Sequence, residues 1–577
     1  MVNLIIDSKR ISVPEGTTIL EAAKMSGIRI PTLCFLKEIN EIGACRVCVV
    51  ELKGKNALVA SCNTKVSEGM EVITNSRKVQ HARKMNVELI LANHNTNCPA
   101  CVRSGNCSLQ SISRALNVGK LPFKREYTNR PWDRNFPFIR NESKCIKCMR
   151  CVQICEKVQT LGIWDIVNTG ARTSVDVAGG KSIAQTACAI CGQCVTHCPV
   201  GALHERDNVE QFLDAIANPN KIVVVQIAPA VRTAWAEDLN LDPALATEKR
   251  MVAAVRALGA DYVFDTNFTA DLTIMEEATE LLHRLTDAEN SALPMFTSCC
   301  PAWVRFLKSQ YPDMIPNLST AKSPQQMFGA VAKSYYAELM DVDPKDIFCV
   351  SIMPCIAKKH EAELPVMNDA GAGQDVDLSI TTRELARALQ CALLDLEALK
   401  EEEFDRPLGT GSGAGVIFGT TGGVMEAALR TAYYKLEGHN PEPDAFRVVR
   451  GAAGIRVTSV QMGGKTVKAA VAHGLGNARK LIEDIRAGVS DVQFVEVMAC
   501  PGGCVGGGGQ PIRDGIEMAQ VRGKKLYSLD RNNCIRFSHE NPDVTDAYDN
   551  YFGHPLSEKS HELLHTDHSA WKMPGEK

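Results

Sequence analysis

The sequence predicts a multidomain protein in which small α+β units precede one large α/β domain. Three observations lead to this prediction. The chain has 577 residues, which is enough for roughly four domains of ordinary size. Fifteen of its 23 cysteines lie before residue 200, so the first third differs in kind from the rest. From about residue 209 onward, strand-like apolar runs alternate with helical ones, the order that a mostly parallel sheet requires.

The composition argues against two classes of partner. The chain carries 64 basic and 67 acidic residues, a net charge of −3, so nucleic acid is a poor partner. The first residues, "MVNLIIDSKR", have no secretory signal, and no run of about 18 apolar residues predicts membrane insertion. We therefore expect a cytoplasmic location, where thiols stay reduced and clustered cysteines bind metals rather than form disulfides.

The first unit spans residues 1–78. Its pattern predicts a hairpin that turns at Asp7 to Lys9 and an amphipathic helix within residues 16–27. Four cysteines follow with the spacing C-x10-C-x2-C-x13-C, namely Cys34, Cys45, Cys48 and Cys62. A close pair with two distant partners suits a 2Fe-2S cluster, and tetrahedral zinc is the alternative.

The second unit, residues 79–135, contains one further group of ligands after a predicted helix. The group has the spacing H-x3-C-x2-C-x5-C, with His94, Cys98, Cys101 and Cys107. A lone histidine near a helix end is usually a surface side chain. Three cysteines, however, are one ligand short of a 4Fe-4S cluster, which favours His94 as the fourth. Neutral imidazole in place of thiolate should raise the potential of such a cluster.

The third unit, residues 136–208, contains an internal repeat of C-x2-C-x2-C-x3-C. This spacing is typical of bacterial two-cluster ferredoxins, in which the fourth cysteine of each run binds the other cluster. One 4Fe-4S set would be Cys145, Cys148, Cys151 and Cys198, and the other Cys188, Cys191, Cys194 and Cys155. With His94, the fifteen cysteines provide sixteen ligands for four iron–sulfur centres. Such a series indicates an electron path with a site at its end.

The fourth unit, residues 209–577, reads as the large α/β domain. Three of its loops carry cysteines: "TSCCPAW", "MPCIAKKHE" and "EVMACPGGCVGGGGQP". Leaving Cys299 aside, they offer four thiolates that suit one more 4Fe-4S cluster, from Cys300, Cys355, Cys500 and Cys504. The glycines of the last loop allow the backbone to approach an inorganic centre closely.

These motifs resemble known proteins along essentially the whole chain. Residues 1–78 and the His94 group resemble the corresponding cluster sites of respiratory complex I's large iron–sulfur subunit and of FeFe hydrogenases. The three cysteine loops together closely resemble the signature of FeFe hydrogenases. The resemblance implies an N-terminal ferredoxin-like (β-grasp) domain, a small histidine/cysteine-ligated cluster domain, a two-4Fe-4S ferredoxin domain and a large α/β H-cluster domain.

The resemblance also implies a cofactor, the H-cluster. Its 4Fe-4S cubane would bind the four thiolates, and Cys504 would bridge to a diiron unit with CO, cyanide and an amine dithiolate. Lys358 would donate a hydrogen bond to a cyanide ligand. The enclosing residues would be Ala230, Pro324, Gln325, Met353, Phe418 and Met498. Ala230 lacks a hydroxyl that some relatives have there.

Cys299 stands beside the predicted ligand Cys300, so it is free to face the diiron unit as a thiol; the alternative is a buried apolar filler. Glu277, Glu280 and Arg284 lie at i, i+3 and i+7 of a predicted helix, which alone is most often a solvated, salt-bridged face. The resemblance implies a proton path from Cys299 through Glu280, Ser319 and Glu277, with Arg284 at the outer end.

Two further features carry no function in this interpretation. "GTGSGA", residues 409–414, fits a loose dinucleotide fingerprint, but the strand-like "AGVIFGT" follows it and no helix is predicted to open there. Cys349, Cys391 and Cys534 are interpreted as packing residues.

The predicted activity is the reversible oxidation of hydrogen to protons and electrons. Electrons would pass through the accessory clusters to ferredoxin or, in an NAD(P)-linked, electron-bifurcating complex, to flavoprotein subunits; maturation proteins would insert the cofactor. A hydrogen sensor is an alternative, disfavoured because Cys299 is retained and no appended sensory domain is evident. An electron-transfer subunit with an inactive C-terminal domain is another, disfavoured because Lys358 and the four cysteines are intact.

Overall fold

The computed structural model describes residues 1–287, 289, 291–451 and 453–574, and the chain divides into two compact units. The smaller unit contains Met1–Ile183, His197–His204 and Asp514–Ile516. The larger unit contains Ala184–Thr196, Glu205–Arg513 and Glu517–Lys577. Within the described residues, no helix combines the length and the apolar character needed to cross a membrane.

A mixed five-stranded sheet forms the N-terminal part of the smaller unit, in the order β2-β1-β5-β3-β4. The predicted hairpin is confirmed, because β1 and β2 are antiparallel and their turn places Asp7 and Ser8 at positive φ. The predicted helix is α1 (Ile19–Met25), and Thr18 and Glu21 form a capping box at its start. The strands are β1 (Val2–Ile6), β2 (Lys9–Val13), β3 (Val49–Leu52), β4 (Leu58–Ala60) and β5 (Glu71–Ile73).

The rest of the smaller unit has little regular structure. Its side chains are fixed by local packing; for example, Trp132 and Trp164 stack with ring centroids 5.9 Å apart. The elements are α2 (Arg77–Ala92), α3 (Ser108–Ala115), β6 (Phe138–Arg140), α4 (Arg150–Lys157), β7 (Trp164–Val167) and β8 (Ser174–Val177).

The larger unit contains two four-stranded sheets. The first, β11-β10-β13-β14, is entirely parallel, and its strands are almost continuous apolar runs, as expected for a sheet covered on both faces. In the second, β12-β17-β16-β15, only the β15–β16 pair is antiparallel. The strands are β10 (Ile222–Ile227), β11 (Tyr262–Asp265), β12 (Met295–Phe296), β13 (Ile347–Met353), β14 (Leu378–Thr381), β15 (Ile455–Met462), β16 (Lys465–His473) and β17 (Phe494–Met498).

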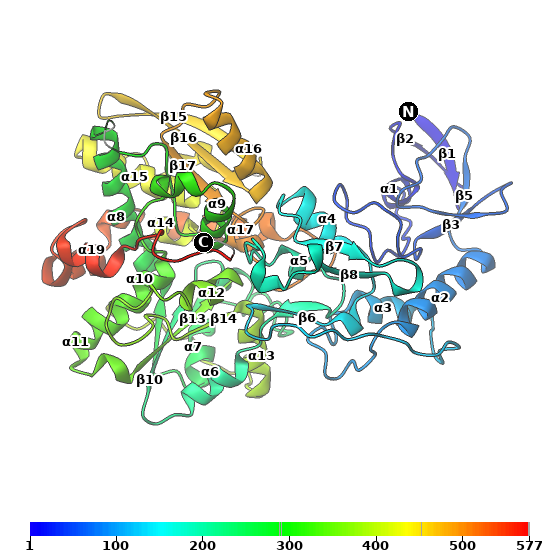
Figure 1. The fold of residues 1–577 in the computed structure, drawn as a ribbon, viewed down its shortest axis with the longest axis horizontal. Coiled ribbons are helices and arrows are strands. Elements are labelled where there is room, and N and C mark those ends of the chain that lie inside the picture. The colour runs from blue at the N-terminus through cyan, green and yellow to red at the C-terminus, as the bar shows by residue number, and fades with distance from the viewer. Residues whose placement is uncertain (288, 290, 452, 575–577) are drawn as a thin grey trace. The chain divides into compact units, whose positions relative to one another are not determined.

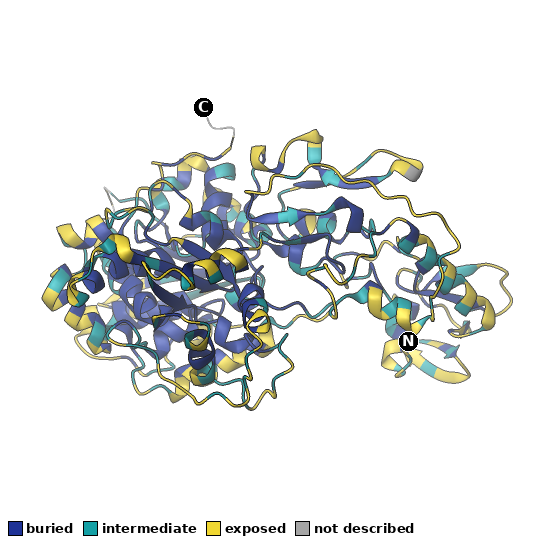
Figure 2. Ribbon diagram, turned by 90° about the horizontal axis from the view of Figure 1, so that it is seen from below, coloured by how far each residue is buried: buried dark blue, intermediate teal, exposed yellow. Residues whose placement is uncertain are grey.

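Helix α8 (Thr266–Thr286), labelled in Figure 1, has most of its residues buried, and the buried residues of the chain gather in the interior of the fold (Figure 2). It follows β11 directly, and the Asp265 carboxylate accepts a hydrogen bond from the Asn267 amide, 2.9 Å away, at its start. It packs against α10 (Pro324–Val331), α14 (Gly413–Ile417) and α15 (Gly423–Glu437). This position carries polar side chains of α8 into the protein interior.

The remaining helices cover the two sheets. Helix α16 (Leu475–Arg486) packs on β15 and β16, while α15 also contacts β15 and β17 (Figure 1). The others are α5 (Gln193–Thr196), α6 (Val209–Ile216), α7 (Glu248–Ala257), α9 (Pro301–Gln310), α11 (Ala337–Met340), α12 (Ala357–Ala362), α13 (Thr382–Cys391), α17 (Ala519–Asn532), α18 (Pro542–Ala547) and α19 (Glu558–Leu564).

One predicted element is wrong. "AGVIFGT" is not a strand, because α14 occupies Gly413–Ile417, so a helix does open after "GTGSGA". Ser412 caps this helix by accepting a hydrogen bond from the Gly415 amide at 3.2 Å, and complete burial overrides the β preference of Val416 and Ile417. Residues 392–412 contain no strand, so the strand-turn-helix order of a dinucleotide site is still missing.

A buried group of charges joins α15 to α17. Arg430 has no exposed surface, and its Nη2 lies 2.7 Å from a Glu426 oxygen and 3.1 Å from an Asp530 oxygen. Arg450 binds both of these carboxylates, and Arg536 binds Asp530. These carboxylates are therefore held by arginines, which accounts for their burial as charged groups.

Replacing Arg430 should destabilise the protein strongly. Arg430→Met leaves Glu426 and Asp530 with too little positive charge, and removing one partner of a buried pair costs about 3–5 kcal/mol. Denaturant unfolding followed by circular dichroism measures this loss. The control is Arg486→Met, whose exposed partner is Asp313; its effect should stay within about 1 kcal/mol. Equal effects from both variants would contradict the prediction.

Candidate functional site

The four cysteines of the N-terminal domain lie together. The Cys34 thiol hydrogen-bonds to Cys45 and lowers the pKa of Cys45 to about 6, and the Cys62 thiol lowers the pKa of Cys48 to about 7 in the same way. The same hydrogen bond to Cys48, together with burial, raises the pKa of Cys62. Thiolate is the form that binds metals, so this set fits a four-thiolate centre.

His94 has the tautomer that a metal ligand needs. Its Nδ1 lies 3.0 Å from the Lys144 carbonyl oxygen and must donate to it, which leaves the lone pair on Nε2. Burial lowers the pKa of His94 to about 4, so the ring is neutral. Burial raises the pKa of Cys107, and charge on Cys101 raises it further. These two predicted ligands therefore lie close to one another.

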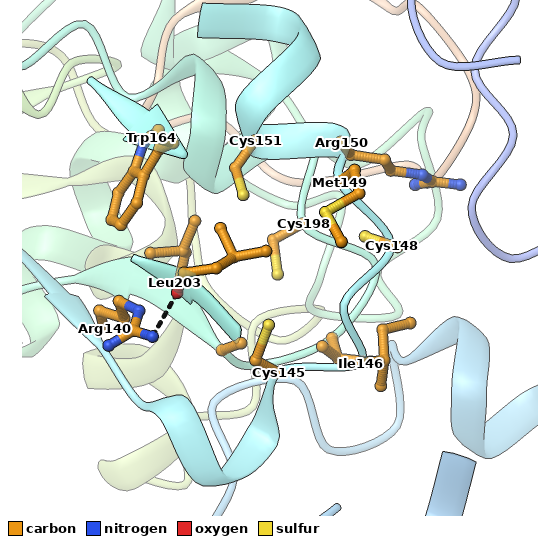
Figure 3. A pocket seen from close by; sticks show the side chains of 13 residues that line it. Arg140, Cys145, Ile146, Cys148, Met149, Arg150, Cys151, Trp164, Cys198 and Leu203 are labelled. Carbon is orange, nitrogen blue, oxygen red and sulfur yellow. Dashed lines mark hydrogen bonds between the residues drawn. The ribbon is translucent and has the colours of Figure 1, made fainter. Parts of the chain in front are cut away.

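The first ferredoxin-like run lines a pocket together with Cys198 (Figure 3). The sulfur atoms of Cys145, Cys148, Cys151 and Cys198 surround a common space, with Trp164 and Leu203 beside it. Burial raises the pKa of Cys148, and charge on Cys198 and Cys145 raises it further. The structure thus brings the last cysteine of the second run to the first three of the first run.

The other predicted set divides between the two units. Cys188, Cys191 and Cys194 belong to the larger unit, and Cys155 belongs to the smaller one, where it accepts a hydrogen bond from the Ile163 amide at 3.5 Å. Burial raises the pKa of Cys188, although the charge of Arg305 opposes this.

The larger unit collects its cysteine loops at the carboxyl ends of both sheets. Cys300 follows β12, Cys355 follows β13, and Cys500 and Cys504 follow β17. Burial raises the pKa of Cys355 to about 12, and charge on Cys300 contributes. Burial raises the pKa of Cys504, and charge on Cys300 and Cys355 raises it further. Burial also raises the pKa of Cys500, and charge on the three other cysteines adds to this. Four sulfurs from three loops therefore meet at one site, a donor set typical of a 4Fe-4S cluster.

Glycines make this meeting sterically possible. A Cβ at Gly507 would lie 2.1 Å from the Pro354 oxygen, and one at Gly509 would lie 2.9 Å from the Cys355 amide nitrogen. Gly503 has φ 92° and would meet the Thr421 amide nitrogen at 2.6 Å. A side chain at Gly507 or Gly509 would push the last cysteine loop away from the "MPC" loop, and one at Gly503 would collide with the Thr420–Thr421 backbone. The close approach of these loops fits a shared inorganic group.

Lys358 points into the same site. Its Nζ lies 2.8 Å from a Glu361 oxygen and 3.2 Å from the Cys299 carbonyl oxygen. Burial works against its charge, but Glu361, Cys355 and Cys299 outweigh burial and raise the pKa of Lys358 above its usual value. Lys358 is therefore a fixed cation. Glu361, which the sequence analysis did not identify, also accepts from Ser323 at 2.8 Å and from Gln325 at 3.1 Å.

The predicted enclosing residues lie on the surrounding loops. Met353 and Met498 end β13 and β17, Ala230 follows β10, and Phe418 packs in the same core cluster as Cys299, Cys300 and Cys504. Pro324 starts α10, and Gln325 accepts from Ser351 at 2.8 Å. Gln510, which sequence reasoning missed, donates to the Ala230 carbonyl oxygen at 2.9 Å.

The proposed proton path needs one correction. Arg284 lies 2.6 Å from Glu280, not beside Glu277, and the Ser319 hydroxyl donates to the other Glu280 oxygen at 2.7 Å. Glu277 is the carboxylate whose charge raises the pKa of Cys299, after burial. The order is therefore Cys299, Glu277, Ser319, Glu280 and Arg284. Helical spacing alone could not distinguish the inner from the outer carboxylate.

Glu277 has a strongly raised pKa. Burial, together with charge on Glu280, raises the pKa of Glu277 to about 8, against opposing contributions from the Ser298 amide and the Ser319 hydroxyl. Within the described residues, neither of its oxygens has a well-formed hydrogen bond. A carboxyl that is protonated near neutral pH can both give and accept a proton, as a relay group must.

A C-terminal segment holds the Ser319 loop, a feature that the sequence analysis missed. Ala321 and His565 form an antiparallel bridge, and the Thr320 hydroxyl lies 2.8 Å from His565 Nδ1. His568 Nε2 lies 2.9 Å from the Ser319 carbonyl oxygen and donates to it. These histidines are about 250 positions from Ser319 in the chain, so no local pattern indicates the contact.

Comparisons with known proteins agree with this geometry. The chain is 47% identical to the NADP-reducing hydrogenase subunit HndD of Solidesulfovibrio fructosivorans, over 98% of both sequences. The chain belongs to the FeFe hydrogenase family. It is also 39% identical to iron hydrogenase 1 of Clostridium pasteurianum, over 98% of this chain and 99% of that one.

Solved FeFe hydrogenases share the fold of the catalytic part. The structure of HydA1 from Chlamydomonas reinhardtii matches with a TM-score of 0.57 and 45% identity, over 64% of this chain and 100% of that one. Residues 221–508 match the C-terminal domain of the iron-only hydrogenase large subunit. Residues 516–571 match the iron hydrogenase small subunit, a division within the predicted 209–577 domain that sequence reasoning did not make.

The N-terminal third of this FeFe hydrogenase carries iron–sulfur domains. Residues 1–77 match a 2Fe-2S iron–sulfur cluster binding domain, and residues 144–202 match a 4Fe-4S dicluster domain. Residues 83–122 match the NADH-ubiquinone oxidoreductase-G iron–sulfur binding region. The protein is therefore an oxidoreductase with accessory iron–sulfur domains.

The pKa of Glu277 gives a pH prediction. Because the pKa is about 8 in the folded protein and near 4.5 when unfolded, Glu277 lowers stability as pH rises between these values, and the loss is complete above pH 8. An infrared pH titration should show a protonated carboxyl band that disappears with a midpoint near pH 8. Glu277→Gln should remove this band, whereas Glu280→Gln, the control, should retain it with a lower midpoint, because charge on Glu280 contributes to the raised pKa. A band that survives Glu277→Gln would contradict the assignment.

Proposed function

We propose that this chain catalyses the reversible oxidation of hydrogen to protons and electrons, with an H-cluster held by Cys300, Cys355, Cys500 and Cys504. The observation that carries the proposal is the meeting of these four thiols beside Cys299 and a buried series of carboxyl groups. Neither a plain electron-transfer domain nor a structural cluster needs a buried proton path.

The protein residues would handle the proton while the bound H-cluster supplies the hydrogen chemistry and the exchange of electrons. Burial raises the pKa of Cys299 well above its usual value, so Cys299 holds its proton as a thiol. Glu277 would receive this proton and pass it by way of the Ser319 hydroxyl to Glu280. Arg284, which also donates to the Pro316 and Leu318 carbonyls, would hold Glu280 in position at the outer end.

Lys358 and the glycine loops would position the cofactor. A charged ammonium held by Glu361 has a further donor for an anionic ligand such as cyanide, and this contact would orient a diiron unit bound through Cys504. The hydrogen bond from Gln510 to the Ala230 carbonyl oxygen would help to position the loop after β10. Ala230 has no side-chain hydroxyl that could do so.

The accessory clusters would carry electrons to and from this site. We propose one 2Fe-2S cluster on Cys34, Cys45, Cys48 and Cys62, one 4Fe-4S cluster on His94, Cys98, Cys101 and Cys107, and two on the ferredoxin-like runs. The neutral His94 and the shared position of Cys198 with the first run support these ligand sets.

NADP is the electron acceptor that we propose, reached through partner subunits. The relative with 47% identity is a subunit of an NADP-reducing hydrogenase, and the strand-turn-helix order of a nucleotide site is missing at residues 409–417. Ferredoxin is the alternative acceptor.

The anaerobically matured chain should reduce a viologen dye under hydrogen but not NADP. Co-purified flavoprotein subunits should restore NADP reduction, and rapid turnover would argue against a sensor.

Cys504→Ala should abolish cofactor retention. The infrared spectrum of the matured protein should contain CO and cyanide stretches, and these should be lost in the variant because the diiron unit has no other covalent bond to the protein. Cys391→Ala, at an exposed cysteine, is the control and should keep the bands. Bands of full intensity in Cys504→Ala would contradict the bridging role.

Cys299→Ser should separate cofactor binding from proton transfer. A serine hydroxyl gives up its proton far less readily than a thiol, so the infrared bands should remain while turnover falls by about 10²-fold or more. Hydrogen–deuterium exchange and dye reduction measure the loss. Full activity in this variant would remove Cys299 from the path.

A further inference from the structure

A buried arginine links the catalytic loops of the larger unit to a cluster loop of the same unit. Arg305 lies on α9, the helix that begins directly after Cys300, and its side chain is only 4% exposed. Its Nε donates to the Cys188 carbonyl oxygen at 3.0 Å. Its Nη1 donates to His360 Nε2 at 2.6 Å.

Within the part of the chain that the structure describes, no carboxylate lies within ion-pair distance of Arg305. Burial, together with charge from Arg305 and Arg206, lowers the pKa of His360 to about 3, so His360 is a neutral acceptor and adds no counter-charge. The other deeply buried arginines described in the larger unit differ: Arg232, for example, binds Asp265 at 2.7 Å, and Arg383 binds Glu205 at 2.6 Å.

An unpaired buried cation costs several kcal/mol, so it requires negative charge nearby from another source. The group that meets this requirement is Cys188, whose thiolate would carry the charge of an iron–sulfur cluster. The Arg305 Nε donates to the backbone of this same residue, which fixes the guanidinium beside the proposed ligand. The guanidinium is thus placed to stabilise negative charge on this loop rather than on a carboxylate.

We propose that Arg305 sets the reduction potential of the cluster held by Cys188, Cys191 and Cys194. The inference rests on the ligand sets proposed above. Reduction adds one electron, supplied by hydrogen oxidation, to the cluster. A fixed cation beside a ligand stabilises the reduced form more than the oxidised form, and therefore raises the potential.

The position of this loop explains why such a cation would matter. The Cys500 Sγ lies 3.7 Å from the Cys191 carbonyl oxygen, and Gln193 Nε2 donates to the Gly506 carbonyl oxygen at 3.1 Å. The Cys188 loop therefore touches the loop that carries two of the catalytic thiols. A cluster there would be the first acceptor for electrons from hydrogen, and a raised potential favours their departure from the catalytic site.

The test is a redox titration of the matured, full-length protein, followed by electron paramagnetic resonance. Arg305→Gln should lower the midpoint potential of one accessory 4Fe-4S signal by at least about 59 mV. For a one-electron step, this shift is a tenfold change in the equilibrium constant for reduction. The other signals should not move. Arg305→Lys keeps the charge and should retain most of the wild-type potential.

Two control variants separate charge from packing. Arg479→Gln removes a cation that packs on Phe306, the residue next to Arg305 on α9. This variant should shift no midpoint potential. His360→Gln keeps a neutral acceptor for Arg305 and should leave the potential near the wild-type value. A shift in His360→Gln equal to that in Arg305→Gln would attribute the effect to packing and overturn the proposal.

The outcomes are distinct from those of the proposed function. Unchanged midpoints in Arg305→Gln with intact signals would overturn the role of Arg305, even in an active hydrogenase. A potential lowered equally in Arg305→Lys would assign the effect to the hydrogen bond rather than the charge, and would also overturn it. If the Arg305→Gln variant loses the cluster, the midpoint potential of Arg305→Lys alone decides whether the proposal stands. The expected shift of one midpoint in a protein without hydrogen turnover would retain the role of Arg305 and reject the proposed activity.

Discussion

The site depends on one topological constraint: the carboxyl ends of two separate sheets must meet. The loop after β12 carries Cys299 and Cys300, the loop after β13 carries Cys355 and Lys358, and the loop after β17 carries Cys500 and Cys504. Open α/β sheets place ligands at this edge because successive loops converge there. Here the convergence involves both sheets, so the glycines at 503, 507 and 509 are needed to let backbone lie against backbone.

Burial is the second determinant, and it favours the uncharged form of the titratable groups near the site. It favours neutral Glu277, a thiol at Cys299 and a neutral His360. Lys358 remains charged because Glu361 is its ion-pair partner. Glu496 is intermediate: burial raises its pKa to about 7, although it accepts from the Gly422 and Met425 amides at the start of α15.

Sequence reasoning succeeded where chemistry is encoded in short spacings. Cys145, Cys148 and Cys151 are close in the chain, and the hairpin and capped helix before residue 28 follow local rules. It failed where tertiary packing decides. The rotation of α8 makes Glu277 the inner carboxylate, burial turns "AGVIFGT" into a helix, and His568 reaches Ser319 from about 250 residues away. Arg305 and Glu361 were missed because a buried charge has no sequence signature.

The adjacent cysteines have a physical role in this arrangement, because they divide the site between two helices. Charge on Glu277 of α8 reaches Cys299, and the chain then enters α9 directly after Cys300. Helix α8 leads to Glu280 and Arg284, where carboxylate, hydroxyl and guanidinium groups suit proton transfer. Helix α9 leads to Arg305 and the Cys188 loop, where a cation without a carboxylate suits an added electron. In the proposed mechanism, protons and electrons would therefore leave through different elements, and the peptide bond between Cys299 and Cys300 would separate the two directions.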